Sequence, residues 1–198
     1  MQVQQLSVKV FVRATADEVT DVDQETLIPI FHKWIRDNRL SQGGEGPLLI
    51  DVADYRHVPK GPGVMLIAHE GHYGLDCGAG RVGMLYGRKR DAIGDAADKL
   101  REVLRSALRA CVALQGESKF DGLQFDPGDL EIRVMSRLVA RNTPDDFAAL
   151  QASVAPVLGQ LFDGAEHTAV QLGDERQPLT MHVRATGTHE ADALLSRL

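Results

Sequence analysis

The densest group of side chains able to do chemistry lies at residues 69–72, where two histidines flank a glutamate and a glycine. Imidazole and carboxylate groups suit zinc or a similar divalent ion. Further candidate ligands lie nearby in the sequence at Asp51, Asp54, His57, Asp76 and Cys77. The spacing is not HExxH, and on a strand His69 and His72 point to opposite faces unless Gly71 forms a bulge. We therefore assign no metal ligand and keep a divalent-metal enzyme that uses His69, Glu70 and His72 as an alternative.

A glycine cluster follows, in the segment Leu75–Gly83 with the sequence LDCGAGRVG. It contains GxGxxG and resembles the LDxGxG signature of S-adenosylmethionine methyltransferases. That resemblance implies a cofactor bound at a strand-to-helix turn. The residues after the glycines, MLYGRKR, have the pattern of a strand instead. They favour a hairpin with its turn near Asp76–Gly80 and a returning strand over 82–88. The methyltransferase-like cofactor binder stays a second alternative, and the cofactor is otherwise unknown.

A binding cleft is our preferred interpretation of the remaining polar and aromatic residues. Loops at strand ends commonly carry binding side chains, and apolar walls with a few polar groups are typical of ligand pockets. The predicted ligand-binding residues are Trp34, Asp54, Tyr55, His57, His69, Glu70, His72 and Tyr73. The competing interpretation places Trp34 in the core under its helix and Tyr55 in a turn.

No GxSxG, Walker A or CxxC motif is present, so acyl transfer and phosphate-loop chemistry have no support. The leading hypothesis is a soluble protein that binds a small molecule or another protein chain without catalysing a reaction. Whether the protein is an enzyme stays open at this level.

Composition narrows the classes of partner. The 198 residues are 43% apolar and 25% charged, which is ordinary for a soluble globular protein. The net charge of -6 argues against a nucleic-acid binder. Because no apolar run is long enough to span a bilayer and the first residues lack a signal-peptide pattern, we expect a cytoplasmic protein without a membrane partner. Two free thiols, Cys77 and Cys111, fit a reducing compartment.

Charge is distributed unevenly along the chain. Residues 81–109 hold eight basic and four acidic side chains, although the whole chain is acidic. Such a stretch indicates an anionic ligand, a complementary subunit face or a solvated helix surface.

Hydrophobic periodicity places the elements that must position these residues. Predicted strands cover residues 8–14, 48–52, 64–70, 72–76, 82–88, 130–140, 167–172 and 179–185. Predicted helices cover residues 25–38, 91–114, 144–162 and 188–198. The helix over 91–114 has the clearest amphipathic pattern, and Pro156 is expected to kink or restart the third helix.

The order of elements predicts an α+β fold with a mixed, mainly antiparallel sheet and helices packed on one face. An N-terminal unit, 1–116, and a C-terminal unit, 117–198, share the order strand, helix, two strands, helix and are expected to pack into one compact domain. Their first helices align as LIPIFHKWIRD and VAPVLGQLFDG. The pattern favours a duplicated βαββ-type unit with pseudo-twofold symmetry. This topology resembles the duplicated effector-binding domains that hold small molecules between their halves, and we expect a homodimer.

Overall fold

A computed structural model describes residues 5–13, 23–41, 46–59, 61–89 and 94–198 of the chain. Its strands are β1 (Leu6–Val12), β2 (Leu49–Asp54), β3 (Val64–Ala68), β4 (Gly71–Asp76), β5 (Gly83–Arg88), β6 (Phe125–Val134), β7 (His167–Leu172) and β8 (Thr180–Ala185). Its α-helices are α1 (Leu27–Asp37), α2 (Ala96–Gln115), α3 (Pro144–Leu161) and α4 (Ala191–Leu195). The eight strands and four helices predicted from the sequence are all present; β7 has its predicted bounds, and the ends of most others are shifted.

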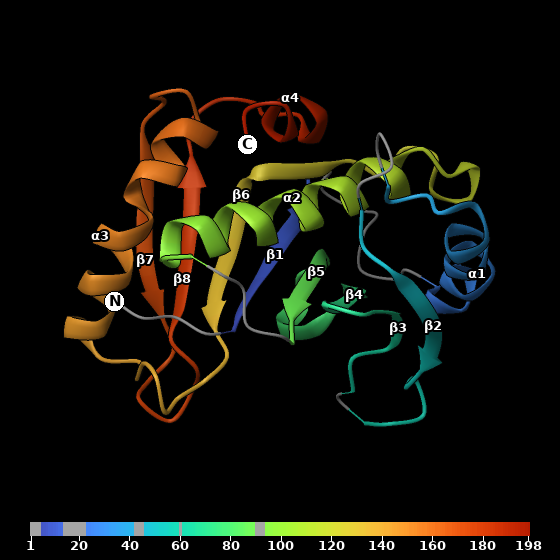
Figure 1. The fold of residues 1–198 in the computed structure, drawn as a ribbon, viewed down its shortest axis with the longest axis horizontal. Coiled ribbons are helices and arrows are strands. Elements are labelled where there is room, and N and C mark those ends of the chain that lie inside the picture. The colour runs from blue at the N-terminus through green and yellow to red at the C-terminus, as the bar shows by residue number, and fades with distance from the viewer. Residues whose placement is uncertain (1–4, 14–22, 42–45, 60, 90–93) are drawn as a thin grey trace.

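One sheet runs through the molecule in the order β2-β3-β4-β5-β1-β6-β8-β7, and every pairing in it is antiparallel. Helix α2 crosses the middle of the sheet, α3 lies over β7 and β8, and α1 packs beside β2 and β3 (Figure 1). The helices cover one face, which confirms the predicted α+β class with helices on one side of an antiparallel sheet.

The pairing register separates two faces of the sheet, because residues directly opposite in antiparallel strands point the same way. One cross-strand row faces the helices and is buried: Leu66, Tyr73, Tyr86, Val8 and Ile132. The next row points away from the helices: Met65, Gly74, Leu85, Lys9 and Glu131. We call this second side the helix-free face, since none of the described helices covers it.

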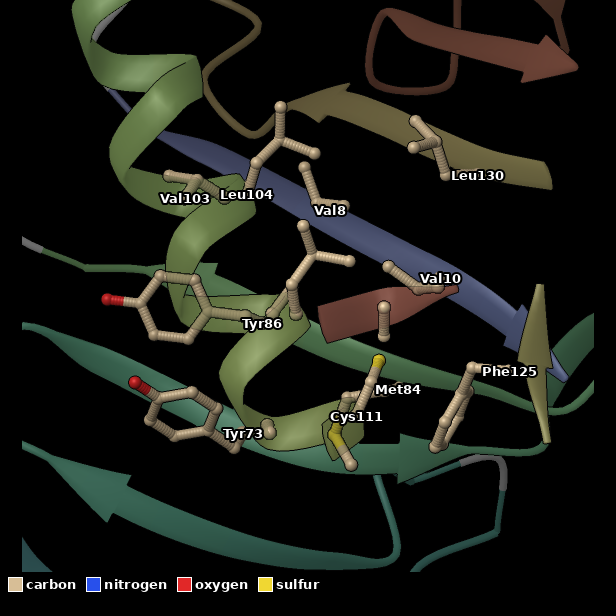
Figure 2. Close-up of a cluster of buried hydrophobic side chains, with 14 of the residues drawn as sticks. Val8, Val10, Tyr73, Met84, Tyr86, Val103, Leu104, Cys111, Phe125 and Leu130 are labelled. Atoms are coloured by element: carbon tan, nitrogen blue, oxygen red, sulfur yellow. The ribbon is translucent and has the colours of Figure 1, made fainter. Parts of the chain in front are cut away.

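Helix α2 supplies the centre of the core. Asp95 caps its first turn by accepting a hydrogen bond from the backbone N–H of Asp98 at 2.9 Å. The predicted apolar stripe is buried as expected, including Val103, Leu104 and Cys111 packed against β1 and β5 (Figure 2). Each fully buried aliphatic side chain of this kind stabilises the fold by about 1.5–3 kcal/mol. Residues 91–93, the predicted start of the helix, lie outside the described residues.

Helix α1 begins and ends close to the prediction. Pro29 lies in its first turn, where a missing N–H costs no helical hydrogen bond. Asn38 ends it in the left-handed conformation, with φ of 48°. Trp34, in the middle of this helix, is completely buried.

The glycine cluster forms the predicted hairpin. Strands β4 and β5 pair antiparallel and are joined by a short 3₁₀ turn at Gly78–Gly80, where Gly80 has φ of 72°. Asp76 fixes the turn by accepting a hydrogen bond from the N–H of Gly78 at 3.0 Å. Because this segment turns from strand to strand, it lacks the strand-to-helix turn that the methyltransferase-like alternative requires.

The prediction of a strand over 130–140 was wrong in its boundaries. Strand β6 starts at Phe125 and ends at Val134. Pro127 and Gly128 have the residue types of a turn, but in the structure they form a bulge, because the register jumps between the β1 partners Val10 and Val12. The later residues leave the sheet, and Leu138 is fully exposed.

The third helix keeps its predicted start and does not restart at Pro156. Thr143 accepts a hydrogen bond from the N–H of Asp146 at 3.3 Å, which is the expected cap. Helix α3 continues through Pro156 to Leu161 without restarting. Helix α4 is shorter than the predicted 188–198.

The two sides of the central β1–β6 pair have an equivalent strand order. Beside β1 lies β5 and then the preceding strand β4, and beside β6 lies β8 and then the preceding strand β7. A helix follows each central strand, α1 after β1 and α3 after β6. Strands β2 and β3 extend only the first side. The single sheet thus includes strands from both units, 1–116 and 117–198, and a duplication within the chain stays a prediction.

Both cysteines are free thiols, as predicted. Burial raises the pKa of the Cys111 thiol well above its ordinary value. Among the described helices, none combines the length and apolar character that a membrane span requires.

Candidate functional site

A cavity of about 550 Å³ opens on the helix-free face, across β3, β4, β5, β1 and the end of β6. We call it the groove. Its lining comprises Gln5, Ser7, Gly61, Pro62, Met65, His72, Tyr73, Gly74, Asp76, Leu85, Gly87, Arg88, Lys89, Arg133 and Met135. The volume is within the range of pockets that bind small organic molecules, about 300–1,000 Å³.

Small residues on neighbouring strands create the groove. His72, Gly87 and Ser7 lie opposite one another on β4, β5 and β1, and Gly74 lies in the adjacent row. A Cβ atom built on Gly87 would be 3.7 Å from its nearest neighbour, the Cβ of Ser7. These glycines are therefore not required by crowding, and their missing side chains leave volume above the sheet.

Apolar side chains form much of the groove wall. Met65 and Leu85 project from β3 and β5, Met135 follows β6, and Pro62 belongs to the loop before β3. The hydroxyl of Ser7 donates a weak hydrogen bond to the Sδ of Met135 at 3.3 Å, which holds the methionine against the β1 end of the groove. The walls are suited to the apolar body of a ligand.

His72 is one of the polar residues in the groove lining. Burial, and to a smaller extent the positive charge of Lys89, lower the pKa of its imidazole below 6.5. The ring is therefore neutral near pH 7. Its Nδ1 atom is buried and has no hydrogen-bond partner within the described part of the chain. A ligand in the groove could supply that partner.

Besides Arg88, which pairs with Glu102, two basic residues line the groove. Lys89 is half-buried, and its ammonium has no ion-pair partner within the residues that the structure describes. Arg133 donates to the hydroxyl of Thr180 at 3.3 Å and approaches Glu131 at 3.5 Å, with its side chain still 41% exposed. Both cations are available to an acidic group on a ligand.

An ionic cluster fills the neighbouring part of the helix-free face. Asp129 accepts hydrogen bonds from Arg81 at 2.8 Å and Arg184 at 3.0 Å, and its other oxygen lies 2.6 Å from Nε2 of His182. Burial alone would raise the pKa of Asp129, but these three hydrogen bonds outweigh burial and hold the pKa below its ordinary value. Arg81 also stacks over the Phe11 ring at 3.5 Å.

Two predicted binding residues lie at the groove. His72 directs its imidazole toward it, whereas the ring of Tyr73 points to the opposite side of the sheet and packs against Tyr86 at a centroid distance of 4.6 Å. Trp34 is not at the groove: it is fully buried, and its indole N–H donates to Oε1 of Glu117 at 2.8 Å. The competing interpretation of Trp34 as a core residue matches this placement.

The predicted loop residues lie at the surface. Tyr55 and His57 stack with a centroid distance of 6.5 Å. Hydrogen bonds from Arg56 lower the pKa of Asp54 to about 2, and Arg56 also pairs with Glu25 before α1. The later residues of the same loop, Gly61 and Pro62, are the ones that reach the groove.

His69 and Glu70 form the tight turn between β3 and β4. Glu70 lines a cavity on the helix-covered side, whereas His72 lines the groove on the other side. Across the described residues, no group of three or more His, Cys, Asp or Glu side chains is arranged to hold a metal ion. The geometry thus separates the residues that the metal-enzyme alternative would bring together.

Sequence reasoning missed the residues that shape the groove, chiefly Gly74, Gly87, Ser7, Lys89 and Arg133. One signal was present: glycine inside a strand often marks a close approach or an open surface, and GHYGLD and GMLYGR each contain such glycines. The pairing of Gly87 with Ser7 could not be read from the sequence.

Comparison with known proteins adds no further assignment to this geometry: no family model matches the chain, and no curated protein matches it either.

Proposed function

We propose that the protein binds a small, largely apolar organic molecule with one acidic group in the groove of the helix-free face. The single observation that carries this proposal is the 550 Å³ groove floored by Gly74, Gly87 and Ser7. The body of the ligand packs between Met65, Leu85 and Met135, where burial of apolar surface drives binding. The acidic group faces Lys89 and Arg133, and a polar atom bonds Nδ1 of His72.

Blocking the groove tests the proposal. Gly87→Leu places a side chain in the groove from a position whose Cβ meets only ordinary contacts. The probe is 1-anilinonaphthalene-8-sulfonate, which combines an apolar body with an anionic group. We expect saturable binding to the parent protein and a dissociation constant at least about tenfold higher for the variant, because the leucine occupies the ligand's volume.

Gly159→Leu is the matched control. It makes the same exchange on α3, where a Cβ on Gly159 has no neighbour within 4 Å, and it lies outside the groove lining. Its probe affinity should equal that of the parent protein. Lys89→Gln should weaken the anionic probe by about two- to fivefold and leave uncharged Nile red unaffected. Binding of the anionic probe that survives Gly87→Leu unchanged would contradict the proposal.

Contact with another protein chain, in particular a second copy, is the second candidate function. Four of the seven exposed large hydrophobic side chains in the described residues, Leu48, Ile50, Tyr55 and Val58, lie on or beside edge strand β2. Clustered exposed apolar residues mark interaction surfaces. The edge itself has a bulge and two exposed aspartates, which oppose strand addition, so side-chain packing is the expected contact.

Sedimentation velocity tests this second candidate. A dimer that dissociates in Ile50→Lys but not in Val170→Lys would support it, because Val170 is equally exposed on the opposite edge strand, β7. A parent protein that is monomeric at every concentration would exclude self-association through β2.

A further inference from the structure

A second cavity, of about 330 Å³, lies on the helix-covered side between α2 and the β4–β5 hairpin. Its lining consists of Gly46, Pro47, Glu70, Tyr86, Glu102, Arg105, Ser106 and Arg109. None of these residues lines the groove. The two cavities are therefore separate sites on opposite sides of the same hairpin.

Two buried polar atoms in its walls lack partners. Oε2 of Glu70 and Nε of Arg109 make no hydrogen bond within the described part of the protein. Glu70 comes from the β3–β4 turn and Arg109 from α2, so an acceptor and a donor enter the cavity from different elements. A buried polar group without a partner is unfavourable, and both groups would be stabilised by a ligand that bonds them.

Arg105 lies one helical turn before Arg109 on α2 and lines the same cavity. Neither guanidinium has an ion-pair partner among the described residues. Both arginines belong to the basic stretch of residues 81–109, for which an anionic ligand was one of three interpretations, beside a subunit face and a solvated helix surface. Two adjacent guanidinium groups form a strong recognition element for a carboxylate.

The other polar residues of the cavity are already engaged or neutral. Glu102 pairs with Arg88. Burial raises the pKa of Tyr86, so its phenol stays protonated, and Tyr86 lies close to Ser106. The same holds for the neighbouring Tyr73, which is not part of this cavity's lining. Figure 2 shows the two tyrosine rings with their hydroxyl oxygens pointing to the same end of the core cluster. Glu70, Arg105 and Arg109 are thus the charged groups left for a ligand.

We infer that this cavity binds a small organic acid that carries a hydrogen-bond donor, such as a hydroxyl or amino group. Its carboxylate lies against Arg105 and Arg109, and its donor bonds Glu70. With Arg88 and Glu102 neutralising each other, these three groups leave one net positive charge. A hydroxy acid balances that charge as a monoanion, whereas a zwitterionic amino acid pairs its ammonium with Glu70 and its carboxylate with the arginines. The volume is at the low end for ligand sites, so the ligand is small. This inference does not depend on the function proposed for the groove.

Arginine side-chain NMR tests the inference directly. The ¹H–¹⁵N signal of the Arg109 Nε–H is assigned by its loss in Arg109→Gln, and the protein is titrated with L-lactate, L-alanine and propionate. These acids have the same size but carry a hydroxyl donor, an amino donor and no donor, respectively. We expect the signal to move with lactate or alanine, with a dissociation constant at least about tenfold lower than for propionate. Which of the two binds tighter identifies the donor.

Variants separate the cavity from other surfaces. Arg105→Gln and Glu70→Gln should each weaken the tighter-binding acid by about tenfold or more. Arg101→Gln is the control, since Arg101 pairs with Asp98 on α2 outside the cavity lining. An Arg109 Nε–H signal that none of the three acids moves, or affinities unchanged in Glu70→Gln, would overturn the inference. Gly87→Leu should leave these titrations unaffected.

Discussion

Two parts of the helix-free face share strands β1 and β6 and differ in what occupies the space above the sheet. Around His72, Gly87 and Ser7 the surface is hollowed into the groove. Around Phe11 and Asp129 the space is filled by long side chains that bond one another, so that Asp129 is only 7% exposed. The difference shows that residue size on neighbouring strands, and not the loops alone, decides where this sheet is open.

Glycine has opposite roles in the two parts. Gly87 leaves its space unfilled, since an added Cβ would meet only the Cβ of Ser7 at 3.7 Å. Gly83, four residues earlier on β5, gives its space to Lys9: an added Cβ would lie 2.7 Å from the carbonyl oxygen of Val10 and 2.9 Å from two carbons of the lysine. Lys9 uses that path to reach Asp76 at 2.7 Å and the carbonyl of Arg81 at 2.6 Å.

The largest expected effect comes from exchanging the two glycines for alanine. Gly83→Ala should lower the free energy of unfolding by about 2–3 kcal/mol, because the backbone of β1 or the buried Lys9 must move. Gly87→Ala should change it by less than about 1 kcal/mol. Urea denaturation of both variants measures the difference. Equal losses at the two positions would remove the distinction between a filled and an open part of the face.

A smaller loss is expected when the ionic cluster loses its central charge. Asp129→Asn leaves Arg81 and Arg184 without their carboxylate and should reduce the free energy of unfolding by about 1–2 kcal/mol near pH 7. Because the folded-state pKa of Asp129 is lowered, its stabilising effect is present above the unfolded value near pH 4 and is lost as pH falls through the folded value.

Chemical denaturation between about pH 3 and pH 7 checks this sign. The difference between parent and Asp129→Asn should shrink toward the acid end. Asp37→Asn, at the exposed pair of Arg36 and Asp37, is the control and should unfold like the parent protein, because solvent screens an exposed ion pair. Probe binding in the groove should be unchanged in Asp129→Asn, and a large loss would mean that the two parts act as one site.

Most of the fold could be predicted because local patterns determine it. The stripe of α2, the cap at Thr143 and the glycine turn of the β4–β5 hairpin depend on residues close in sequence. Strand β6 was misplaced because Pro127 and Gly128 have turn chemistry, and only pairing with β1 shows that they form a bulge within a strand.

The candidate site was harder to predict because the type of a side chain does not show whether it lies in the core, at the surface or in a cavity. Trp34 looked like a ligand contact, yet Glu117, more than eighty residues later, takes its N–H inside the core. Glu70 and His72 look like one cluster, but they line cavities on opposite sides of the sheet. The groove depends on Gly87 facing Ser7, a register between distant segments that no local pattern encodes.

The smallest expected effect concerns the charge state of His72 within the open part. Its pKa lies below 6.5 because of burial first and Lys89 second, so lowering the pH through that pKa converts a neutral ring into a cation. Burying that cation against an apolar ligand is unfavourable, and Nile red should therefore bind about two- to threefold more weakly at the acid end. The anionic probe, whose sulfonate stays ionised, should bind more tightly over the same range.

Opposite pH trends for the two probes are the discriminating result. Fluorescence titrations of the parent protein and His72→Gln measure them, and both trends should vanish in the variant, which keeps a polar side chain but cannot titrate. If both probes follow one direction, or if His72→Gln keeps the trends, the protonation that governs binding belongs to another group. Opposite trends that depend on His72 would place its imidazole close to both the apolar body and the acidic group of the ligand.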